Sequence, residues 1–133
     1  EQKHHLSTDL LQLVAQVARP LGAHATILCQ QARVATVTSY SATMIDVVVP
    51  DSAPRLDLDD GPIPTRALVD REDELTGEIV VWVRAGRLIG LEQAWYTDEP
   101  PIAWPLPDAV RVTGATEGQA HSRVTHLHSR TTR

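Results

Sequence analysis

Glu92 is the carboxylate of this chain that is best placed for acid–base chemistry. It lies in a strand-like run of small and apolar residues, and a carboxyl group buried among such neighbours is suited to act as a general acid or base. The commoner alternative is an open face on which Glu92 meets water or an arginine. In the hairpin predicted below for residues 77–83 and 87–96, Glu78 lies directly opposite Glu92. Two like charges at this distance are unfavourable unless a proton or a cation intervenes. We therefore favour the structural interpretation and predict no catalytic residue.

Other patterns that could carry chemistry are weak. His126 and His128 form an HxH pair, but no cluster of Cys, Asp or Glu accompanies it, so we expect no metal site. Cys29 is expected in a strand beside Leu28, as a small apolar residue rather than a nucleophile. The chain contains no Gly-x-Ser-x-Gly elbow and no glycine-rich phosphate loop that opens a helix. The sequence predicts no cofactor.

Aromatic residues point to binding rather than catalysis, because Trp and Tyr dominate the energetics of many protein interfaces. The alternative is that these residues fill the core of a protein without phenylalanine, and we favour that alternative for Trp95. The predicted binding surface consists of Trp82, Leu88, Glu92, Tyr96 and Trp104.

Charge and composition limit the partners. Up to Val112 the chain has 9 Lys and Arg against 16 Asp and Glu, and beyond it 3 against 1. An acidic body repels a phosphate backbone, so we expect no nucleic-acid binding by the folded part. The single cysteine cannot form an internal disulfide, and no membrane span or signal peptide is recognisable. We expect a cytoplasmic protein that does not associate with a membrane.

The length of 133 residues predicts one domain, residues 1–112. Residues 113–133 are polar and contain only Val124 and Leu127 as large aliphatic residues, so we expect a disordered tail.

The elements of the domain follow from its hydrophobic periodicity. Apolar residues at spacings of three and four predict an amphipathic helix that begins at Ser7 and ends near Arg19. Runs rich in β-branched residues predict strands at 24–29, 33–39 and 43–49.

A long proline- and aspartate-rich loop is expected at residues 50–64. It either forms a mobile lid or packs Leu56 and Leu58 back onto the sheet.

The clearest predicted feature is a hairpin formed by residues 77–83 and 87–96. A two-residue type I′ turn would put Ala85 at positive φ, which is unfavourable for a residue with a Cβ atom. We therefore prefer a type I turn with a bulge, in which only Gly86 has positive φ.

This turn fixes the predicted register, which pairs Val83 with Arg87, Val81 with Ile89, Ile79 with Leu91, Trp82 with Leu88 and Glu78 with Glu92. The aliphatic face is expected to pack under the helix, with Leu13 among the contacts, and the mixed second face to be covered by a partner.

The sequence LEQAWYTDEPPIAWPLPD, residues 91–108, follows the hairpin sequence VWVRAGRLIG. This region is similar to the C-terminal part of an uncharacterised family of short proteins from high-GC bacteria. The resemblance covers residues 77–112 and implies no activity, cofactor or catalytic residue.

Together these observations predict an α+β domain, with one N-terminal helix packed on a mostly antiparallel sheet of about five strands. The expected function is a non-enzymatic binding or assembly module that binds another protein or self-associates as a homodimer through the second hairpin face. The alternative is a small-molecule-binding or enzymatic domain with a pocket between sheet and helix, in which Glu92, Tyr96 or Asp46 would be the polar groups.

Overall fold

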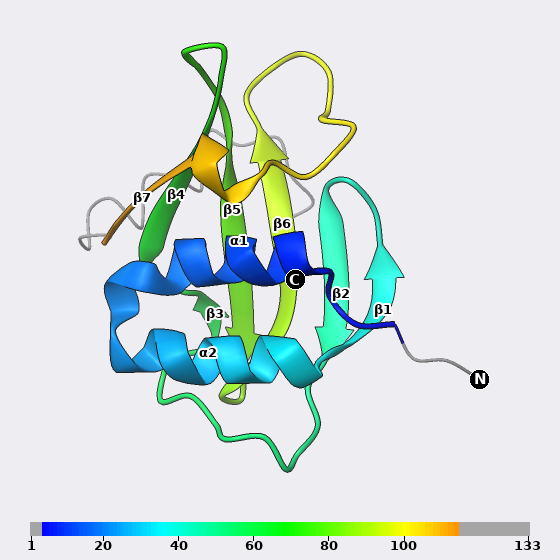
Figure 1. Cartoon of the computed structure of the whole chain (residues 1–133), viewed down its shortest axis with the longest axis vertical. Helices are drawn as coiled ribbons and strands as arrows, with labels where there is room; N and C mark the ends of the chain where they lie inside the picture. Colours follow the sequence, from blue (N-terminus) through cyan, green and yellow to red (C-terminus); the bar gives the residue numbers. More distant parts are fainter. Residues whose placement is uncertain (1–3, 115–133) are drawn as a thin grey trace.

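The computed structural model of the chain describes residues 4–114, which form an α+β fold with two α-helices on one face of a seven-stranded antiparallel sheet (Figure 1). The helices are α1 (Thr8–Ala18) and α2 (Ala23–Val34), with 3₁₀ turns η1 (Arg19–Leu21) and η2 (Pro107–Ala109). The strands are β1 (Thr36–Tyr40), β2 (Met44–Val48), β3 (Gly61–Pro62), β4 (Thr65–Arg71), β5 (Glu74–Arg84), β6 (Arg87–Trp95) and β7 (Val110–Gly114). The strand order is β1-β2-β6-β5-β4-β7, and β3 pairs with β5. The α+β class is confirmed, with one more helix and about two more strands than predicted.

Helix α1 forms as the sequence predicts. The Ser7 hydroxyl accepts a hydrogen bond from the Leu10 backbone N–H at 3.2 Å, and Asp9 lies in the first turn, where its charge complements the helix dipole. The helix ends at Ala18, followed by η1, which contains Pro20. Its buried residues are Leu10, Leu13, Val14, Val17 and Ala18.

Helix α2 corrects the prediction of a strand at residues 24–29. The segment contains three Ala and two Gln, which are good helix formers, and Leu28, Ala32 and Ala35 lie buried at a spacing of three to four residues. The β-branched residues Thr26 and Ile27 suggested a strand, but packing of this periodic face decides the outcome. The predicted strand at 33–39 is shortened, because β1 begins only at Thr36.

The turn of the β5–β6 hairpin also differs from the prediction. Ala85 and Gly86 both have positive φ, 53° and 74°, as in a type I′ turn. The loop before β3 holds this strained turn. Asp60 Oδ1 accepts from the Ala85 N–H at 2.8 Å, the Arg55 guanidinium donates to the Ala85 carbonyl at 2.7 Å, and the Leu56 N–H donates to the Gly86 carbonyl at 2.8 Å. These tertiary hydrogen bonds offset the strain at Ala85.

The predicted hairpin register is wrong, because a bulge lies in β6 rather than in the turn. Val83 pairs with Leu88 and Trp82 with Gly90, which leaves Ile89 as the extra residue. Leu88 therefore lies on the face under the helices instead of beside Trp82. Farther along, the observed pairs are Val81 with Leu91, Ile79 with Gln93, Val80 with Glu92 and Glu78 with Ala94.

The proline-rich loop packs back onto the body, the second of the two predicted arrangements. Leu56 is buried in the core, and Leu58 is partly buried against it. The loop also contributes β3, whose Gly61 and Pro62 pair with Val83 and Trp82 of β5.

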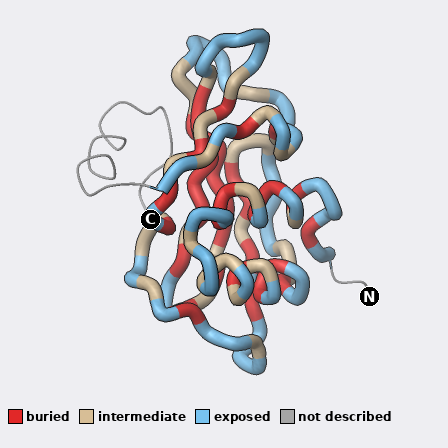
Figure 2. The backbone as a smooth tube through the Cα atoms, turned by 60° about the vertical axis from the view of Figure 1, so that its left-hand side comes forward, coloured by how far each residue is buried: buried red, intermediate tan, exposed pale blue. Residues whose placement is uncertain are grey.

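The hydrophobic core lies between the helices and the sheet (Figure 2). It includes the predicted core residues Leu13, Val81 and Leu91. The other face carries Met44, Val80 and Ala94, which are buried but do not belong to this core cluster. Among residues 4–114, no helix is long and apolar enough to cross a membrane.

Candidate functional site

The structure divides the predicted binding surface into three parts. Trp82 of β5, Glu92 of β6 and Tyr96, which directly follows β6, lie together on the face of the sheet that points away from the helices. Leu88 is fully buried in the core on the opposite face, so it does not belong to this surface. Trp104 packs partly against the core cluster on the helical side.

The part that remains together, which we call the carboxylate face, consists of Glu78, Glu92, Trp82, Tyr96 and Val80. The Trp82 indole N–H donates to Glu92 Oε1 at 3.0 Å, and the Tyr96 hydroxyl donates to Glu78 Oε2 at 3.1 Å. The two glutamates are not directly opposite each other, contrary to the prediction, because Glu92 pairs with Val80. This removes the direct like-charge contact that the predicted register implied.

The carboxylate face holds Tyr96 in its neutral form. Burial raises the pKa of the Tyr96 phenol, and the neighbouring Glu78 raises it further, whereas Arg66 partly opposes both effects. Tyr96 therefore acts as a hydrogen-bond donor to Glu78 at neutral pH rather than as a base.

Groups with metal-binding or nucleophilic chemistry are sparse in the described part of the chain. Residues 4–114 contain no group of three or more His, Cys, Asp or Glu that could hold a metal ion. The predicted His126–His128 pair lies outside the described residues. Cys29 lies on α2 instead of a strand, and burial raises the pKa of its thiol, which disfavours the reactive thiolate.

The predicted alternative of a pocket between sheet and helix does not match the placement of its polar groups. Glu92, Tyr96 and Asp46 lie on the face away from the helices, since Met44 of β2 pairs with Glu92 and Asp46 with Gly90. The space between the sheet and the helices is filled by the hydrophobic core.

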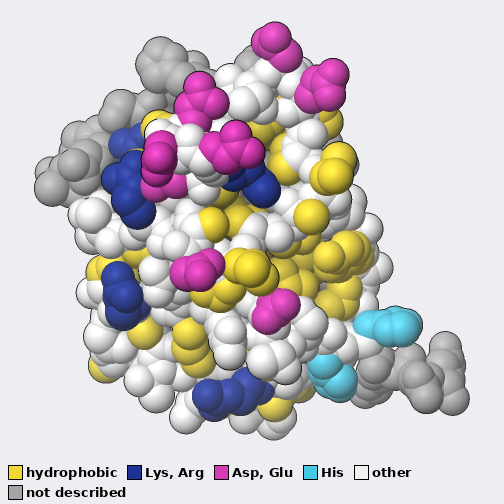
Figure 3. Space-filling view, turned by 45° about the horizontal axis from the view of Figure 1, so that its top comes forward, with side chains coloured by type: hydrophobic (Ala, Val, Ile, Leu, Met, Phe, Trp, Pro, Cys, Tyr) yellow, Lys and Arg dark blue, Asp and Glu magenta, His cyan; other side chains and the backbone are white. Residues whose placement is uncertain are grey.

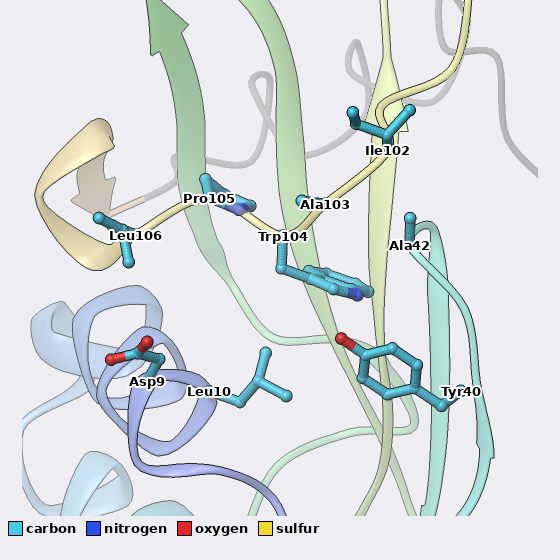
Figure 4. Close-up of a pocket in the computed structure, with 9 residues that line it drawn as sticks. All are labelled: Asp9, Leu10, Tyr40, Ala42, Ile102, Ala103, Trp104, Pro105 and Leu106. Carbon is cyan, nitrogen blue, oxygen red and sulfur yellow. The ribbon is translucent and has the colours of Figure 1, made fainter.

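A different feature, which we call the Tyr40 groove, lies where the start of α1 meets β1 and the segment before η2. It consists of two adjoining hollows of about 290 and 440 Å³ that share Leu10 and Tyr40. The first hollow is also lined by Trp104 and Leu106, and Figure 4 shows the side chains of Leu10, Tyr40 and Trp104 pointing toward one another. The second hollow extends along β1, an edge strand of the sheet, to His4 and His5.

Hydrogen bonds between distant segments hold the walls of the Tyr40 groove together. The side-chain amide of Gln93, on β6, donates to the Ala42 carbonyl at 2.8 Å and to the Ala103 carbonyl at 3.1 Å. The Trp104 indole N–H donates to the Ser41 carbonyl at 2.8 Å. Both contacts join the β1–β2 turn to the segment around Trp104, so the groove is formed before any partner binds.

The rim of the Tyr40 groove exposes large apolar side chains. Ile102 is 96% exposed, Tyr40 62% and Leu106 58%. Figure 3 shows hydrophobic side chains gathered between acidic side chains and a pair of histidines. Asp9 lies on the wall of the first hollow, beside Leu10. Because sizeable apolar patches on folded proteins usually mark contact sites, this groove is the strongest candidate site of the described chain.

Sequence reasoning found only Trp104 of this groove. The sequence pattern places Leu10 on the predicted helix and does not distinguish Tyr40 from other strand residues, because the contact between Tyr40 and Trp104 forms only in the folded protein. The available signal was the aromatic and proline-rich run at residues 100–107, whose Ile102 and Leu106 had no expected place in the core.

Comparisons with known protein families, with curated proteins and with solved structures find no match. The function is therefore inferred from the chemistry of the site.

Proposed function

We propose that this protein is a non-enzymatic binding module that takes a segment of another protein into the Tyr40 groove. The observation that carries the proposal is the exposure of Tyr40, Ile102 and Leu106 around one preformed hollow. Its walls include the aromatic and aliphatic side chains of Tyr40, Trp104 and Leu10, which suit an apolar anchor residue of a partner. Polar residues such as Asp9, Ser7 and Ser39 line the same groove.

The charge of the protein indicates the chemistry of that segment. The chain up to Val112 has 9 Lys and Arg against 16 Asp and Glu, and Asp9 lies on the groove wall. An acidic surface attracts a cationic partner and repels a second copy of itself. The bound segment is therefore apolar with flanking Lys or Arg.

The position of the groove beside β1 supports an extended conformation of the bound segment. An edge strand offers backbone N–H and C=O groups to an added strand. The N-terminal residues already use part of this edge, where the Val37 N–H donates to the His4 carbonyl at 2.8 Å. The segment would continue along β1 toward Tyr40, with its anchor side chain beside Trp104.

A peptide-display selection on the intact protein tests this function. We expect enriched peptides to carry an apolar residue flanked by Lys or Arg, and Tyr40→Glu to weaken their binding at least about tenfold. Val48→Glu is the matched control, because Val48 is a similarly exposed strand residue outside the groove, 57% exposed. Equal binding by both variants, or enrichment of acidic peptides, would contradict the proposal.

Light scattering on the same variants separates a protein partner from a second copy. We expect no dimer that depends on Tyr40. A dimer that dissociates with Tyr40→Glu and persists with Val48→Glu would assign the groove to self-association instead. The homodimer expected from the sequence stays a prediction.

A further inference from the structure

The first hollow of the Tyr40 groove has two aromatic walls. Tyr40 belongs to β1 and Trp104 to the segment before η2, and Figure 4 shows their side chains pointing toward one another beside Leu10. Tyr40 is largely exposed, whereas Trp104 packs partly against the core. The face of an aromatic ring carries partial negative charge, so a hollow between two rings attracts a cation.

The charge of the same hollow also favours a cation. Among its nine lining residues in the described chain, Asp9 is the only one with a charged side chain. The folded part of the protein is acidic as well, so its field attracts cations toward the groove. A carboxylate and two aromatic rings in one hollow therefore suit a side chain that is positively charged and apolar in shape.

The hydrogen bonds of the walls indicate what kind of cation fits. The Ser41 carbonyl accepts from the Trp104 indole N–H, and the Ala42 and Ala103 carbonyls both accept from the Gln93 amide. An unmodified ammonium or a guanidinium brings several N–H donors, and it loses its water unfavourably unless acceptors replace that water. An ammonium whose N–H groups are replaced by methyl groups needs no such acceptors, and its methyl surface matches the aliphatic walls.

The size and the rim of the hollow suit a long side chain of a bound segment. Its volume of about 290 Å³ lies near the lower end of small-molecule pockets, about 300 Å³. Ile102 and Leu106 on the rim are exposed, so the aliphatic stem of a lysine can pack against them while its end group enters the hollow. The adjoining second hollow along β1 leaves room for the backbone of the segment.

We propose that the first hollow binds an N-methylated lysine side chain of the partner segment, with the methylammonium group between Tyr40 and Trp104 and the Asp9 carboxylate supplying the opposite charge. This inference rests on the proposed function, which requires an apolar anchor residue, and it identifies that anchor. A trimethyllysine is apolar at its surface and still carries a full positive charge.

Four peptides that differ only in their central residue test the inference on the full-length protein. The central residue, flanked by Lys and Arg in every peptide, is trimethyllysine, lysine, leucine or the uncharged isostere of trimethyllysine in which carbon replaces the quaternary nitrogen. Fluorescence anisotropy gives the dissociation constants. We expect trimethyllysine to bind at least about fivefold more tightly than lysine and than the isostere, because the isostere has the same shape without the charge.

Variants of the groove locate this preference. The measured quantity is the ratio of the dissociation constants for the isostere and for trimethyllysine, in which the contribution of the flanking residues cancels. Tyr40→Leu keeps an apolar wall without a ring, and Asp9→Asn removes the charge, so each should lower the ratio at least about twofold. Tyr40→Phe keeps the ring and should retain a higher ratio than Tyr40→Leu. Asp57→Asn, the matched control, removes an exposed charge outside both hollows and should leave the ratio unchanged.

Several results would overturn the inference. Equal binding of trimethyllysine and its isostere, or tighter binding of unmodified lysine, would show that the hollow does not select a methylated cation. A ratio that is unaffected by Tyr40→Leu would place the methylammonium group elsewhere. Free tetramethylammonium that bound as tightly as the trimethyllysine peptide would assign the hollow to small ligands. If the leucine peptide still bound and shifted the Trp104 indole signal, the proposed function would stand without this inference.

Discussion

Replacing Gln31 with leucine should destabilise the fold by about 2 to 4 kcal/mol, because Gln31 is a buried polar link between α2 and the β5–β6 hairpin. The side chain is 0% exposed. Its amide donates to the Pro54 carbonyl at 2.7 Å and to the Gly86 carbonyl at 2.9 Å, and its Oε1 accepts from the Leu88 N–H at 2.8 Å.

The magnitude follows from the partners that remain after the substitution. The Leu88 N–H loses its acceptor in a buried position, which costs about 1 to 3 kcal/mol. The Gly86 carbonyl keeps its hydrogen bond from the Leu56 N–H, and Pro54 is exposed and can bind water, so these two losses add about 1 kcal/mol together. Leucine has a similar volume and should leave no large cavity.

Equilibrium denaturation in urea measures this change. The matched control is Gln30→Leu, an exposed position one residue away on the same helix, which should change the free energy of unfolding by less than about 0.5 kcal/mol. The slope of the free energy with urea concentration should be the same for both variants. A loss below about 0.5 kcal/mol for Gln31→Leu would refute the reasoning that this side chain holds the hairpin to the helix.

Three further predictions concern the core, the hairpin turn and the carboxylate face. Leu13→Ala should lower the free energy of unfolding by about 2 to 5 kcal/mol in a denaturant titration, because Leu13 is fully buried, and a loss under about 0.5 kcal/mol would contradict this. Ala85→Gly should raise the unfolding free energy by about 0.5 to 1 kcal/mol, because glycine relieves the positive φ of 53°, and a decrease would show that the turn is not strained. The pKa of Tyr96 is raised, so the folded state keeps a proton that the unfolded chain loses, and stability should fall as pH rises above about 10. Tyr96→Phe should remove that part of the pH dependence, and an unchanged profile would contradict the assignment.

The sequence was sufficient where a local signal decided the structure. The spacing of Leu10, Leu13, Val14 and Val17 predicted α1, and the strand pattern around the hairpin predicted β5 and β6. The same reasoning failed at α2, because local β-branched residues compete there with a helical packing face that only the tertiary structure reveals.

The turn shows why the hairpin register could not be predicted. Positive φ is locally unfavourable at Ala85, which has a Cβ atom. Hydrogen bonds from Asp60 and Arg55, which lie in a loop distant in the sequence, nevertheless hold the turn in this conformation. The bulge at Ile89 then moves Leu88 to the core face. Two of the five residues of the predicted binding surface therefore lie elsewhere. The bulge moves Leu88 to the core face, and the path of the chain after β6 brings Trp104 to the helical side.

The groove itself depends on contacts between segments that are far apart in the sequence. Gln93 joins the turn at Ala42 to the segment at Ala103, and this pairing places Tyr40 beside Trp104. No periodicity marks such contacts, so sequence reasoning identified an aromatic region without its shape.

Titration of the ¹⁵N-labelled protein with a peptide that carries one large apolar residue between Lys and Arg residues examines the proposed binding function at the site itself. The Trp104 indole N–H, which donates to the Ser41 carbonyl, reports on the Tyr40 groove, whereas the Trp82 indole N–H, which donates to Glu92, reports on the opposite face. Binding in the groove predicts a saturable shift of the Trp104 indole signal with an unchanged Trp82 signal. A shift of the Trp82 signal with an unchanged Trp104 signal, or no shift of either signal, would contradict it.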